Sequence, residues 1–511
     1  MKLGALLTAL EKRTALPPDW LEREVGNIAS DSRKVKPGSL FVAVRGFHSD
    51  GHQFISQAKK QGAMAIIAEN SGGVKDADAV PIILVPDSRL ALARLATVFY
   101  GHPSQRLKLI GITGTKGKTT TSYLVKSIIE AAGHTTGLIG TIDYRIGSTV
   151  YPAPNTTPES LDLQRLLREM VDAGAAYCVM EVSSHALALG RTNGCVFEAA
   201  VFTNLQQDHL DFHQDKEAYF QAKLLLFIGL APDKTAVVNV DDAASPEIIQ
   251  RKKTPIYTFG ISGQADIHPL GNIGHTISGL AFSVQTPKGV LDVESPLVGQ
   301  FNVYNILAAI GAGFALGFTL DVIAEGIKGM KAVPGRMEKV DEGQPFGVVV
   351  DYAHTEDSLA SLLEAVRAMA KARIITVFGC GGDRDRTKRP KMGAVAVKGS
   401  DVIIVTSDNP RSENPLDIIS EIETGMTGGM KITSPDTEPL AVSEKKPYYV
   451  IPDRHEAVAA GVRMARPGDV VVLAGKGHED YQIIGEMKIP FDDRETAREE
   501  IRKRQGSSAR S

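Results

Sequence analysis

Apolar runs alternate with stretches of helical spacing through the middle of the chain. Each run is short and rich in Val, Ile or Ala, and the runs lie at residues 107–113, 175–180, 199–205 and 235–240. The stretches between them, such as 119–133 and 217–230, place apolar residues three or four positions apart. Buried strands that alternate with amphipathic helices predict an α/β fold with a mostly parallel sheet.

The rhythm changes at two places, which divides the chain into three predicted domains. Residues 1–90 combine short apolar runs with polar turns, and residues 91–334 hold the alternation just described. The Pro-Gly pair at the end of this region interrupts it, and from 335 to 511 the strand–helix rhythm starts again. A polar segment at 428–447 departs from the rhythm and predicts an insertion or a long surface loop.

Composition and charge exclude several classes of function. With 43% hydrophobic and 23% charged residues, the chain of 511 residues is typical of a globular protein. A net charge of −3 leaves no excess of cations for binding nucleic acid. No apolar run reaches about 18 residues, so we expect no membrane span. The first residues, MKLGALLTALEKR, lack a signal-peptide cleavage site and predict an amphipathic helix. The 3 cysteines are far apart and predict reduced thiols, so we expect the protein in the cytoplasm. We also expect a monomer.

The stretch GITGTKGKTTT at 111–121 connects a predicted strand to a predicted helix. The common phosphate-binding template G-x-x-x-x-G-K-[ST] requires glycine at position 112, where this chain has Ile. Gly114 and Gly117 nevertheless allow backbone N–H groups to turn inward at a helix N-terminus, which favours a bound phosphate. Lys118 would then reach the terminal phosphates, and Thr119 or Thr120 would hold Mg²⁺. A tight turn without a ligand is the alternative.

Acidic residues and a lysine follow the neighbouring strands. Glu181 ends one strand, and Asp208, His209 and Asp211 follow another, which would place Mg²⁺ ligands at the carboxyl edge of the sheet. Each segment alone would equally suit a solvated loop. Lys223 lies on the apolar stripe of a helix, and this spacing alone indicates a surface lysine whose aliphatic chain covers apolar residues.

Two asparagines and an arginine lie near the predicted junction between the second and third domains. Asn302 and Asn305 share one face at the start of a predicted helix, where capping of the helix is the simplest role for one of them. Arg336 follows the Pro-Gly interruption and would clamp phosphates there, or lie on the surface without a ligand.

In the third domain, apolar runs lead directly into polar or glycine-rich loops. These loops contain Asp351, Arg384, the tetrapeptide Asp-Asn-Pro-Arg at 408–411, and Glu479. Ligands of open α/β sheets bind at the carboxyl ends of the strands. Arginine recognises carboxylates, and Asp408 and Glu479 would bind an ammonium, which predicts a zwitterionic or multiply charged small molecule as the ligand. Turn formation explains each loop alone but less readily all of them.

These motifs together resemble the Mur ligases, ATP-dependent enzymes that form amide bonds in bacterial cell-wall precursors. Residues 113–120, called the phosphate loop below, match the family's T-G-T-x-G-K-T-[ST], in which Ile at position 112 is expected. Further matches follow in order along nearly the whole chain, at 31–33, 155–160, 181–185, 203–211, 219–227, 301–305, 334–340, 351–355, 379–386, 408–411 and 475–479.

The resemblance implies three α/β domains and a role for each. The first would bind UDP, the central one would be a P-loop-type ATPase domain, and the last would be Rossmann-like and bind an amino acid. Residues assigned to ATP by the resemblance are Thr113, Gly114, Thr115, Lys116, Gly117, Lys118, Thr119, Thr120, Asn302, Asn305, Arg336 and Asp351. Two Mg²⁺ ions are expected on Thr119, Glu181, His209 and Lys223, the last carbamylated to N6-carboxylysine. Lys118, His209 and Lys223 would act in catalysis.

The other substrates follow from the same resemblance. A UDP-sugar dipeptide would be held by Ser32 with the loop at 47–49, and by Asn155, Thr156, Thr157, Ser183, Leu189 and Arg191. The family often has Gln where this chain has Leu189, and Pro where it has Glu356, so the first of these positions lacks one expected polar contact.

The amino acid that the enzyme would add is implied by the form of residues 408–411. Asp-Asn-Pro-Arg is associated with meso-diaminopimelate rather than lysine, and the second carboxylate of diaminopimelate suits two arginines. Its site would comprise Arg384, Asp408, Asn409, Pro410, Arg411, Gly475 and Glu479. ATP would activate the D-glutamate γ-carboxylate as an acyl phosphate, and closure of domains would bring the amine to it.

Three alternatives remain open at this point. They are the lysine-adding form of the same ligase, a folylpolyglutamate synthetase, which shares the type of phosphate loop, and a P-loop NTPase switch that acts on a macromolecule. The Asp-Ser-Arg at 31–33 argues against folate, and Arg411 argues against lysine. A switch would leave the loops of the third domain unexplained.

Overall fold

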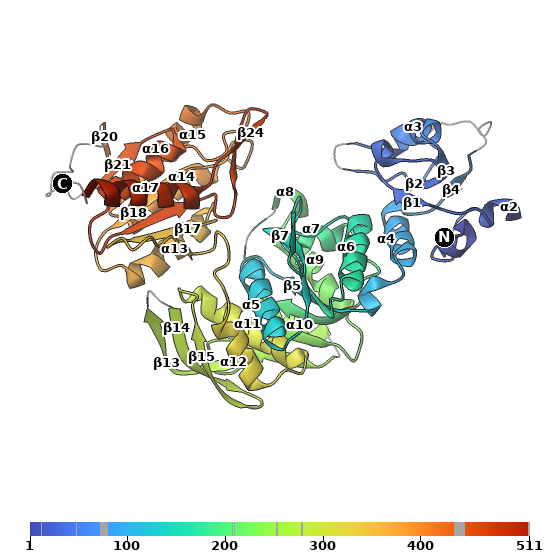
Figure 1. The fold of residues 1–511 in the computed structure, drawn as a ribbon, viewed down its shortest axis with the longest axis horizontal. Coiled ribbons are helices and arrows are strands. Elements are labelled where there is room, and N and C mark those ends of the chain that lie inside the picture. The colour runs from blue at the N-terminus through green and yellow to red at the C-terminus, as the bar shows by residue number, and fades with distance from the viewer. Residues whose placement is uncertain are drawn as a thin grey trace. The chain divides into compact units, whose positions relative to one another are not determined.

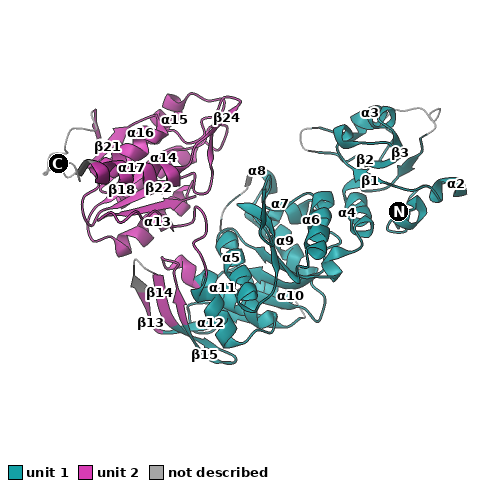
Figure 2. Cartoon of the chain, in the orientation of Figure 1, with its two compact units in different colours: residues 1–270, 283–292, 304–329 teal, residues 271–282, 293–303, 330–511 magenta. Residues whose placement is uncertain are grey.

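The structure is a computed structural model that describes residues 1–11, 13–46, 49–71, 80–206, 208, 210–251, 254–276, 279–433 and 445–508 (Figure 1). Contacts between Cα atoms divide the chain into two compact units (Figure 2). Unit 1 comprises residues 1–270, 283–292 and 304–329, and unit 2 comprises 271–282, 293–303 and 330–511. The predicted boundaries near residues 90 and 334 stay predictions.

The first sheet of unit 1 is small and wholly parallel, in the order β1-β2-β3-β4. Its strands are β1 (Asn27–Ala29), β2 (Ser39–Val42), β3 (Ala63–Ala68) and β4 (Ile82–Leu84). The helices of this part are α1 (Leu3–Leu7), α2 (Pro18–Leu21), α3 (Ile55–Lys60) and α4 (Ser88–Phe99), with 3₁₀ turns at Ser32–Lys34, Gly51–Phe54 and Pro103–Gln105. The amphipathic first helix is therefore present, and Leu3, Leu6 and Leu7 are buried.

The second sheet of unit 1 has eight strands in the order β12-β11-β10-β5-β9-β6-β7-β8. The strands are β5 (Lys108–Thr113), β6 (Thr136–Ile139), β7 (Asp143–Ile146), β8 (Thr149–Pro152), β9 (Tyr177–Glu181), β10 (Phe197–Phe202), β11 (Thr235–Asn239) and β12 (Ile256–Phe259). The pairs β6–β7 and β7–β8 are antiparallel, and the other pairs are parallel. The predicted parallel sheet is confirmed, and the phosphate loop leaves its central strand β5, where the strand order reverses.

Helices cover this sheet and fix the direction of the loops at its edge. They are α5 (Lys118–Ala131), α6 (Ser160–Asp172), α7 (Ser184–Ala188), α8 (Leu210–His213), α9 (Lys216–Ile228), α10 (Ser245–Arg251), α11 (Phe301–Ala315) and α12 (Leu320–Lys328). Apolar residues of α6, α9 and α10 form one buried cluster with alternate residues of the strands. A further sheet of β13 (His268–Thr276), β14 (Gly279–Thr286) and β15 (Gly289–Ser295) was not predicted, because glycine and polar residues obscure its alternation.

Unit 2 contains a seven-stranded sheet in the order β16-β17-β22-β18-β19-β21-β20. The strands are β16 (Glu338–Lys339), β17 (Gly347–Asp351), β18 (Ile374–Phe378), β19 (Val402–Val405), β20 (Gly429–Ile432), β21 (Lys446–Val450) and β22 (Val470–Ala474). All pairs are parallel except β16–β17. A separate hairpin consists of β23 (Tyr481–Ile484) and β24 (Met487–Pro490).

Helices pack on both faces of this sheet. One buried cluster joins it to α13 (Glu356–Met369), α14 (Lys388–Gly399) and α15 (Pro415–Glu423), and another joins it to α16 (Arg454–Met464) and α17 (Asp493–Ser508). Burial on both faces explains why these strands are nearly continuous Val and Ile runs.

The long loop predicted at 428–447 is wrong at both ends, because its flanks form the paired strands β20 and β21, of which β20 is at the edge of the sheet. Residues 434–444 lie outside the described residues. The described helices include none with the length and apolar character needed to cross a bilayer.

Candidate functional site

The phosphate loop requires glycine at two places in unit 1. Gly114 and Gly117 have φ of +149° and +85°. A Cβ at Gly114 would lie 1.9 Å from Thr203 Oγ1, and one at Gly117 would lie 2.4 Å from Asn305 Oδ1. The loop therefore depends on these glycines for close packing as well as for backbone conformation, and it leads into the N-terminus of α5.

Uncharged groups that follow β10 hold the phosphate loop from one side. The Lys116 N–H donates to Asn204 Oδ1 at 3.0 Å, and Asn204 Nδ2 donates back to the Lys116 carbonyl at 3.1 Å. Thr203 Oγ1 donates to the same carbonyl at 2.7 Å, and the Thr115 N–H donates to the Asn204 carbonyl at 2.9 Å. Residues 203 and 204, which lie in a predicted motif, thus serve here as neutral anchors.

Two lysine amines lie against the phosphate loop. Lys118 Nζ donates to the carbonyls of Gly114 and Thr115, both at 2.9 Å, and Lys223 Nζ donates to the Gly114 carbonyl at 2.9 Å. The surface position that helical spacing indicated for Lys223 is wrong, because Lys223 is 1% exposed. Its helix α9 packs against the sheet, so its polar end meets the loop carbonyl. Burial, followed by the charge of Lys118, lowers the pKa of Lys223 well below its usual value.

Glu181 at the end of β9 faces the first turn of α5. Its Oε2 accepts from Thr119 Oγ1 and from Thr141 Oγ1, each at 3.0 Å, and its Oε1 accepts from the Thr141 N–H at 2.9 Å. The sequence analysis did not identify Thr141. A Gly-Thr pair directly after a strand is the signal that could have indicated it. A buried carboxylate beside hydroxyl groups offers only oxygen ligands, which fits Mg²⁺.

The remaining metal candidate, His209, lies outside the described residues. Among the residues that the structure does describe, no three or more His, Cys, Asp or Glu side chains gather as a metal cluster. An ion that keeps several waters needs few protein ligands, so the Glu181 group still fits Mg²⁺.

Residues assigned to the sugar-nucleotide dipeptide adjoin Glu181. Thr141 Oγ1 lies 3.1 Å from Thr156 Oγ1, and Thr157 Oγ1 donates to the Glu181 carbonyl at 2.8 Å. The Ser183 N–H donates to Thr157 Oγ1 at 3.0 Å, and Arg191 Nη1 donates to the Thr157 carbonyl at 3.1 Å. Asn155 precedes them on an exposed turn. The structure thus brings these candidates to the same edge of the sheet as the phosphate loop.

A cavity of about 460 Å³ lies near this cluster and contains two arginines that the sequence analysis missed. Its lining consists of Arg45, Gly46, Glu69, Pro86, Asp87, Arg89 and Leu189. Arg89 Nη2 donates to the Arg45 carbonyl at 2.9 Å. Leu189, which the resemblance assigned to the UDP-sugar dipeptide, belongs to this lining. Ser32 is not among the lining residues, is 7% exposed and donates to Gln57 Oε1 at 3.1 Å.

The other nucleotide candidates divide between the units. Asn305 belongs to unit 1 and accepts from Thr121 Oγ1 at 3.4 Å, beside the phosphate loop. Asn302 belongs to unit 2 and donates to the Val298 carbonyl at 2.7 Å. Arg336 and Asp351 also belong to unit 2, where the Arg336 guanidinium lies 4.9 Å from the Tyr352 ring centre. Burial raises the pKa of Asp351, whose carboxylate accepts from two backbone N–H groups.

In unit 2, the amino-acid candidates Asp408, Asn409 and Glu479 surround a lysine that was not predicted. Lys476 is fully buried, and its Nζ lies 3.2 Å from Asn409 Oδ1, 3.2 Å from Glu479 Oε2 and 3.6 Å from Asp408 Oδ1. Asn409 Nδ2 also donates to Glu479 Oε2 at 2.8 Å. Asp408 Oδ1 is buried and has no hydrogen bond, which leaves an acceptor for a further cation. Gly475 adjoins it, since a Cβ there would lie 3.2 Å from Asp408 Oδ2.

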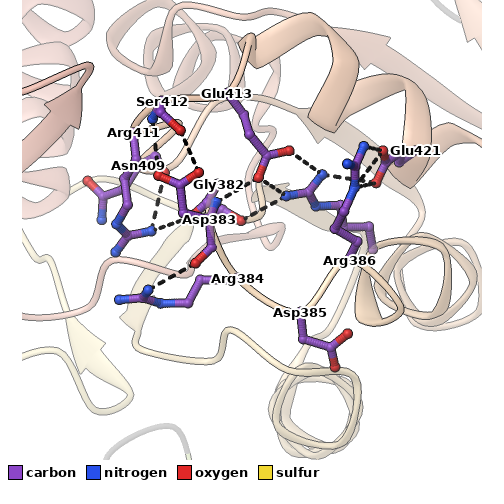
Figure 3. Close-up of polar contacts among 12 residues, drawn as sticks. Gly382, Asp383, Arg384, Asp385, Arg386, Asn409, Arg411, Ser412, Glu413 and Glu421 are labelled. Carbon is purple, nitrogen blue, oxygen red and sulfur yellow. Dashed lines mark hydrogen bonds and ion pairs between the residues drawn. The ribbon is translucent and has the colours of Figure 1, made fainter. Parts of the chain in front are cut away.

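Arg384 and Arg411 converge in the same unit (Figure 3). A Cβ at Gly381 would lie 2.9 Å from Arg411 Nη1 and 3.7 Å from Arg384 Cγ. Arg411 Nη1 donates to the Gly382 carbonyl at 2.8 Å, and Arg384 Nη1 donates to the Asp383 carbonyl at 3.0 Å. Within the described part of the chain, neither guanidinium forms an ion pair with a carboxylate. Both therefore keep their positive charge available.

Comparison with known proteins places the whole chain in one family. Three family models match: the Mur ligase catalytic domain at 24–100, the Mur ligase middle domain at 112–313 and the Mur ligase glutamate ligase domain at 335–477. Two relatives are named UDP-N-acetylmuramoyl-L-alanyl-D-glutamate–2,6-diaminopimelate ligase. That of Geobacillus thermodenitrificans is 48% identical over 99% of this chain and 100% of its own, and that of Solibacter usitatus is 47% identical over 98% of each.

A solved structure with the same name covers 99% of this chain and 100% of its own, with a TM-score of 0.71 and 33% identity. The sequence matches, the three matched domain models and this shared architecture all agree with the α/β fold described above. The chain belongs to the Mur ligase family.

Proposed function

We propose that the chain is the ATP-dependent ligase that joins meso-2,6-diaminopimelate to the D-glutamate γ-carboxylate of UDP-N-acetylmuramoyl-L-alanyl-D-glutamate. This reaction belongs to peptidoglycan precursor synthesis. The observation that carries the proposal is similarity over the full length to ligases of that name, at 48% and 47% identity. The charges of the two units agree with it. Unit 1 presents lysines at the phosphate loop, and unit 2 presents Arg384 and Arg411, which have no acidic partner among the described residues.

The chemistry follows from the poor reactivity of a carboxylate. The γ-carboxylate oxygen attacks the γ-phosphorus of ATP, which gives an acyl phosphate and ADP. The amine of diaminopimelate then attacks the acyl carbon, and a tetrahedral intermediate releases inorganic phosphate and a proton. Lys118, at the N-terminus of α5, offsets negative charge on the transferring group.

Thr119 and Glu181 would hold Mg²⁺ together with His209 and the carbamate of Lys223. When bound, the ions would neutralise phosphate charge. Lys223 suits carbamylation because its lowered pKa favours the neutral amine, whose nitrogen attacks CO₂ and loses a proton. The product would be a buried anion close to Gly114 and Lys118.

The second substrate and the amino acid occupy separate places in this proposal. Arg45 and Arg89 in the cavity would bind the diphosphate of the UDP-sugar, with Leu189 at its wall. In unit 2, Asp408 and Glu479 would bind an ammonium of diaminopimelate, and Arg384 and Arg411 its distal carboxylate. Pro410 and Gly475 would shape the pocket around them.

One assay tests the function. Phosphate release is measured with ATP, Mg²⁺ and the UDP-dipeptide, together with meso-diaminopimelate, L-lysine or no amino acid. We expect release only with an amino acid, and a much higher kcat/KM for meso-diaminopimelate. Equal kcat/KM with lysine would favour the lysine-adding ligase, and full release without an amino acid would favour a nucleotide switch.

A further inference from the structure

Two loops of unit 2 carry the free arginines and contact each other along their backbones. The arginine loop, residues 381–386, contains Arg384, and the DNPR loop, residues 408–411, contains Arg411. The Gly382 N–H donates to the Asn409 carbonyl at 2.9 Å. A Cβ at Gly382 would lie 1.9 Å from the Pro410 carbonyl oxygen, so the approach is as close as glycine allows.

Both loops contain a backbone conformation that only their surroundings can maintain. Asp383 and Arg411 each have φ of +52°. For residues other than glycine this left-handed conformation costs roughly 1–2 kcal/mol. The hairpin β23–β24 holds Arg411 from one side, because the Arg411 N–H donates to the Ile483 carbonyl at 3.1 Å and the Gly485 N–H donates to the Arg411 carbonyl at 2.8 Å.

Glu413 and Ser412, which follow Arg411 in the chain, hold Asp383. Glu413 Oε1 accepts from the Asp383 N–H at 2.6 Å. Ser412 donates to the Asp383 carboxylate through Oγ at 2.6 Å and through its N–H at 3.2 Å. These bonds join the two left-handed residues, one in each loop, through a single short segment of chain.

A buried arginine, Arg389, fixes the carboxylate of Glu413. Arg389 is fully buried, and it donates to both Glu413 oxygens, through Nη2 at 2.8 Å and through Nη1 at 2.9 Å. Its Nη1 also donates to Glu421 Oε2 at 2.9 Å, and Glu421 pairs in turn with Arg386. A bidentate arginine–carboxylate pair is strong and directional, so Glu413 has little freedom to turn.

The arginines of this region therefore fall into two kinds (Figure 3). Arg386 and Arg389 are neutralised by Glu413 and Glu421. Among the residues that the structure describes, the side chains of Arg384 and Arg411 donate only to backbone carbonyls. Figure 3 shows the side chains of Arg384 and Arg411 on one side of Asp383, with Arg386 and Glu421 on the other and Glu413 between them. Although Glu413 is two residues from Arg411, Arg389 and the Asp383 N–H occupy its carboxylate.

We propose that Glu413 and Arg389 are positioning residues that fix the spacing of Arg384 and Arg411, and so set the preference for an amino acid with a distal carboxylate. Neither residue touches the substrate. The Glu413–Arg389 pair holds the arginine loop against the DNPR loop. Arg389 also keeps the Glu413 carboxylate away from the Arg411 guanidinium. The inference rests on the proposed function.

The test compares Glu413→Ala with Glu421→Ala. Both changes remove one carboxylate from buried Arg389, but they differ in how the lost acid contacts the arginine loop. Glu413 accepts from the loop backbone at the Asp383 N–H, whereas Glu421 contacts the loop through the Arg386 side chain at its end. Each variant leaves Arg389 a remaining acidic partner, so we expect both to fold. For Glu413→Ala we expect the KM for meso-diaminopimelate to rise about 30-fold, with KM for ATP and kcat within about threefold, since a charged hydrogen-bonded anchor is lost. Glu421→Ala should stay within about twofold, because the bond from the Asp383 N–H to Glu413 remains.

The readout that separates positioning from mere stability is the ratio of kcat/KM for meso-diaminopimelate to that for L-lysine. Loss of arginine spacing should lower this ratio in Glu413→Ala, because lysine has no distal carboxylate. An unchanged ratio in Glu413→Ala, or an equal fall in Glu421→Ala, would overturn the proposal. If Glu413→Ala does not fold, Glu413→Gln keeps the shape and one acceptor, and it should lower the ratio to a smaller extent.

The wild type is assayed first, so that failure of the proposed function can be distinguished from failure of the positioning role. A wild type that releases no phosphate with meso-diaminopimelate contradicts the proposed function. A wild type that prefers meso-diaminopimelate, with a Glu413→Ala variant that prefers it equally, contradicts only the positioning role.

Discussion

The phosphate loop of unit 1 and the arginine loop of unit 2 both present cations to an expected anion, but they are anchored in opposite ways. Thr203 and Asn204 hold the phosphate loop with uncharged groups. Asp383 and Glu413 hold the arginine loop with carboxylates. The two kinds of anchor also differ in the other groups with which they form hydrogen bonds and ion pairs.

The carboxylates that anchor the arginine loop are occupied by groups other than Arg384 and Arg411. Arg389 and a backbone N–H occupy Glu413, and Ser412 occupies Asp383. Around the phosphate loop the lysine amines donate to carbonyl oxygens, and the anchors at 203 and 204 carry no charge. The acidic anchor Glu413 is thus paired with a cation, Arg389, that is distinct from Arg384 and Arg411.

The largest effect is expected from Lys223→Met, which removes the buried amine beside the phosphate loop. If the carbamate is required, kcat should fall roughly 100-fold or more. The melting temperature should not fall, because a buried amine that must stay neutral adds no stability. Phosphate release and thermal unfolding measure the two effects. Lys216→Met, at the exposed start of the same helix, is the control, and full activity of Lys223→Met would exclude the carbamate role.

A smaller effect is expected when the phosphate loop is given an acidic anchor like that of the arginine loop, which tests whether its anchor must be uncharged. Asn204→Asp keeps the acceptor for the Lys116 N–H but adds a negative charge without a neutralising partner. The KM for ATP should rise roughly tenfold, because like charges a few ångströms apart repel by about that much. Asn204→Ala loses both this acceptor and the Nδ2 donor to the Lys116 carbonyl, adds no charge and should cost about threefold. Equal KM values for the two variants would show that charge is not the reason for a neutral anchor.

The smallest effect concerns the acidic anchor of the arginine loop and its dependence on pH. Hydrogen bonds from Arg389 lower the pKa of Glu413 to about 2. A lowered pKa in the folded state stabilises the protein above the ordinary carboxyl pKa and loses that contribution as pH falls toward about 2.

Chemical denaturation of the wild type and of Glu413→Gln between pH 7 and pH 3 checks this sign. The wild type should be more stable by about 1 kcal/mol or less, since a partly exposed pair contributes little. The difference should be constant above pH 5 and shrink below it. A difference that grows as pH falls would contradict the assigned ionisation.

Much of the fold could be predicted because its strands are buried on both faces and therefore form continuous apolar runs. The strands β5, β17 and β22 occur where such runs predict them. The antiparallel strands β7 and β8 and the sheet β13–β15 were missed, since residues on a solvated face weaken the apolar signal.

The site was predicted where a residue type belongs to a local motif, and missed where its role depends on distant neighbours. Gly114 and Gly117 were found from their spacing around a strand–helix junction. Thr141 and Lys476 were not, because their partners lie 40 and 67 positions away in the chain. Lys223 was identified by resemblance, whereas its helical spacing alone indicated the surface position that its burial contradicts.

The sequence by itself determined the α/β class, the glycine positions of the phosphate loop and the types of residue available for an anion and an ammonium. Only the tertiary structure decided which of those charges remain available. Four arginines lie between 384 and 411, and nothing in their spacing separates Arg384 and Arg411 from Arg386 and Arg389. The distinction arises because Glu413 and Glu421, 24 and 32 positions from Arg389, fold onto it. A charge is available only when no opposite charge lies beside it, and that depends on distance in space.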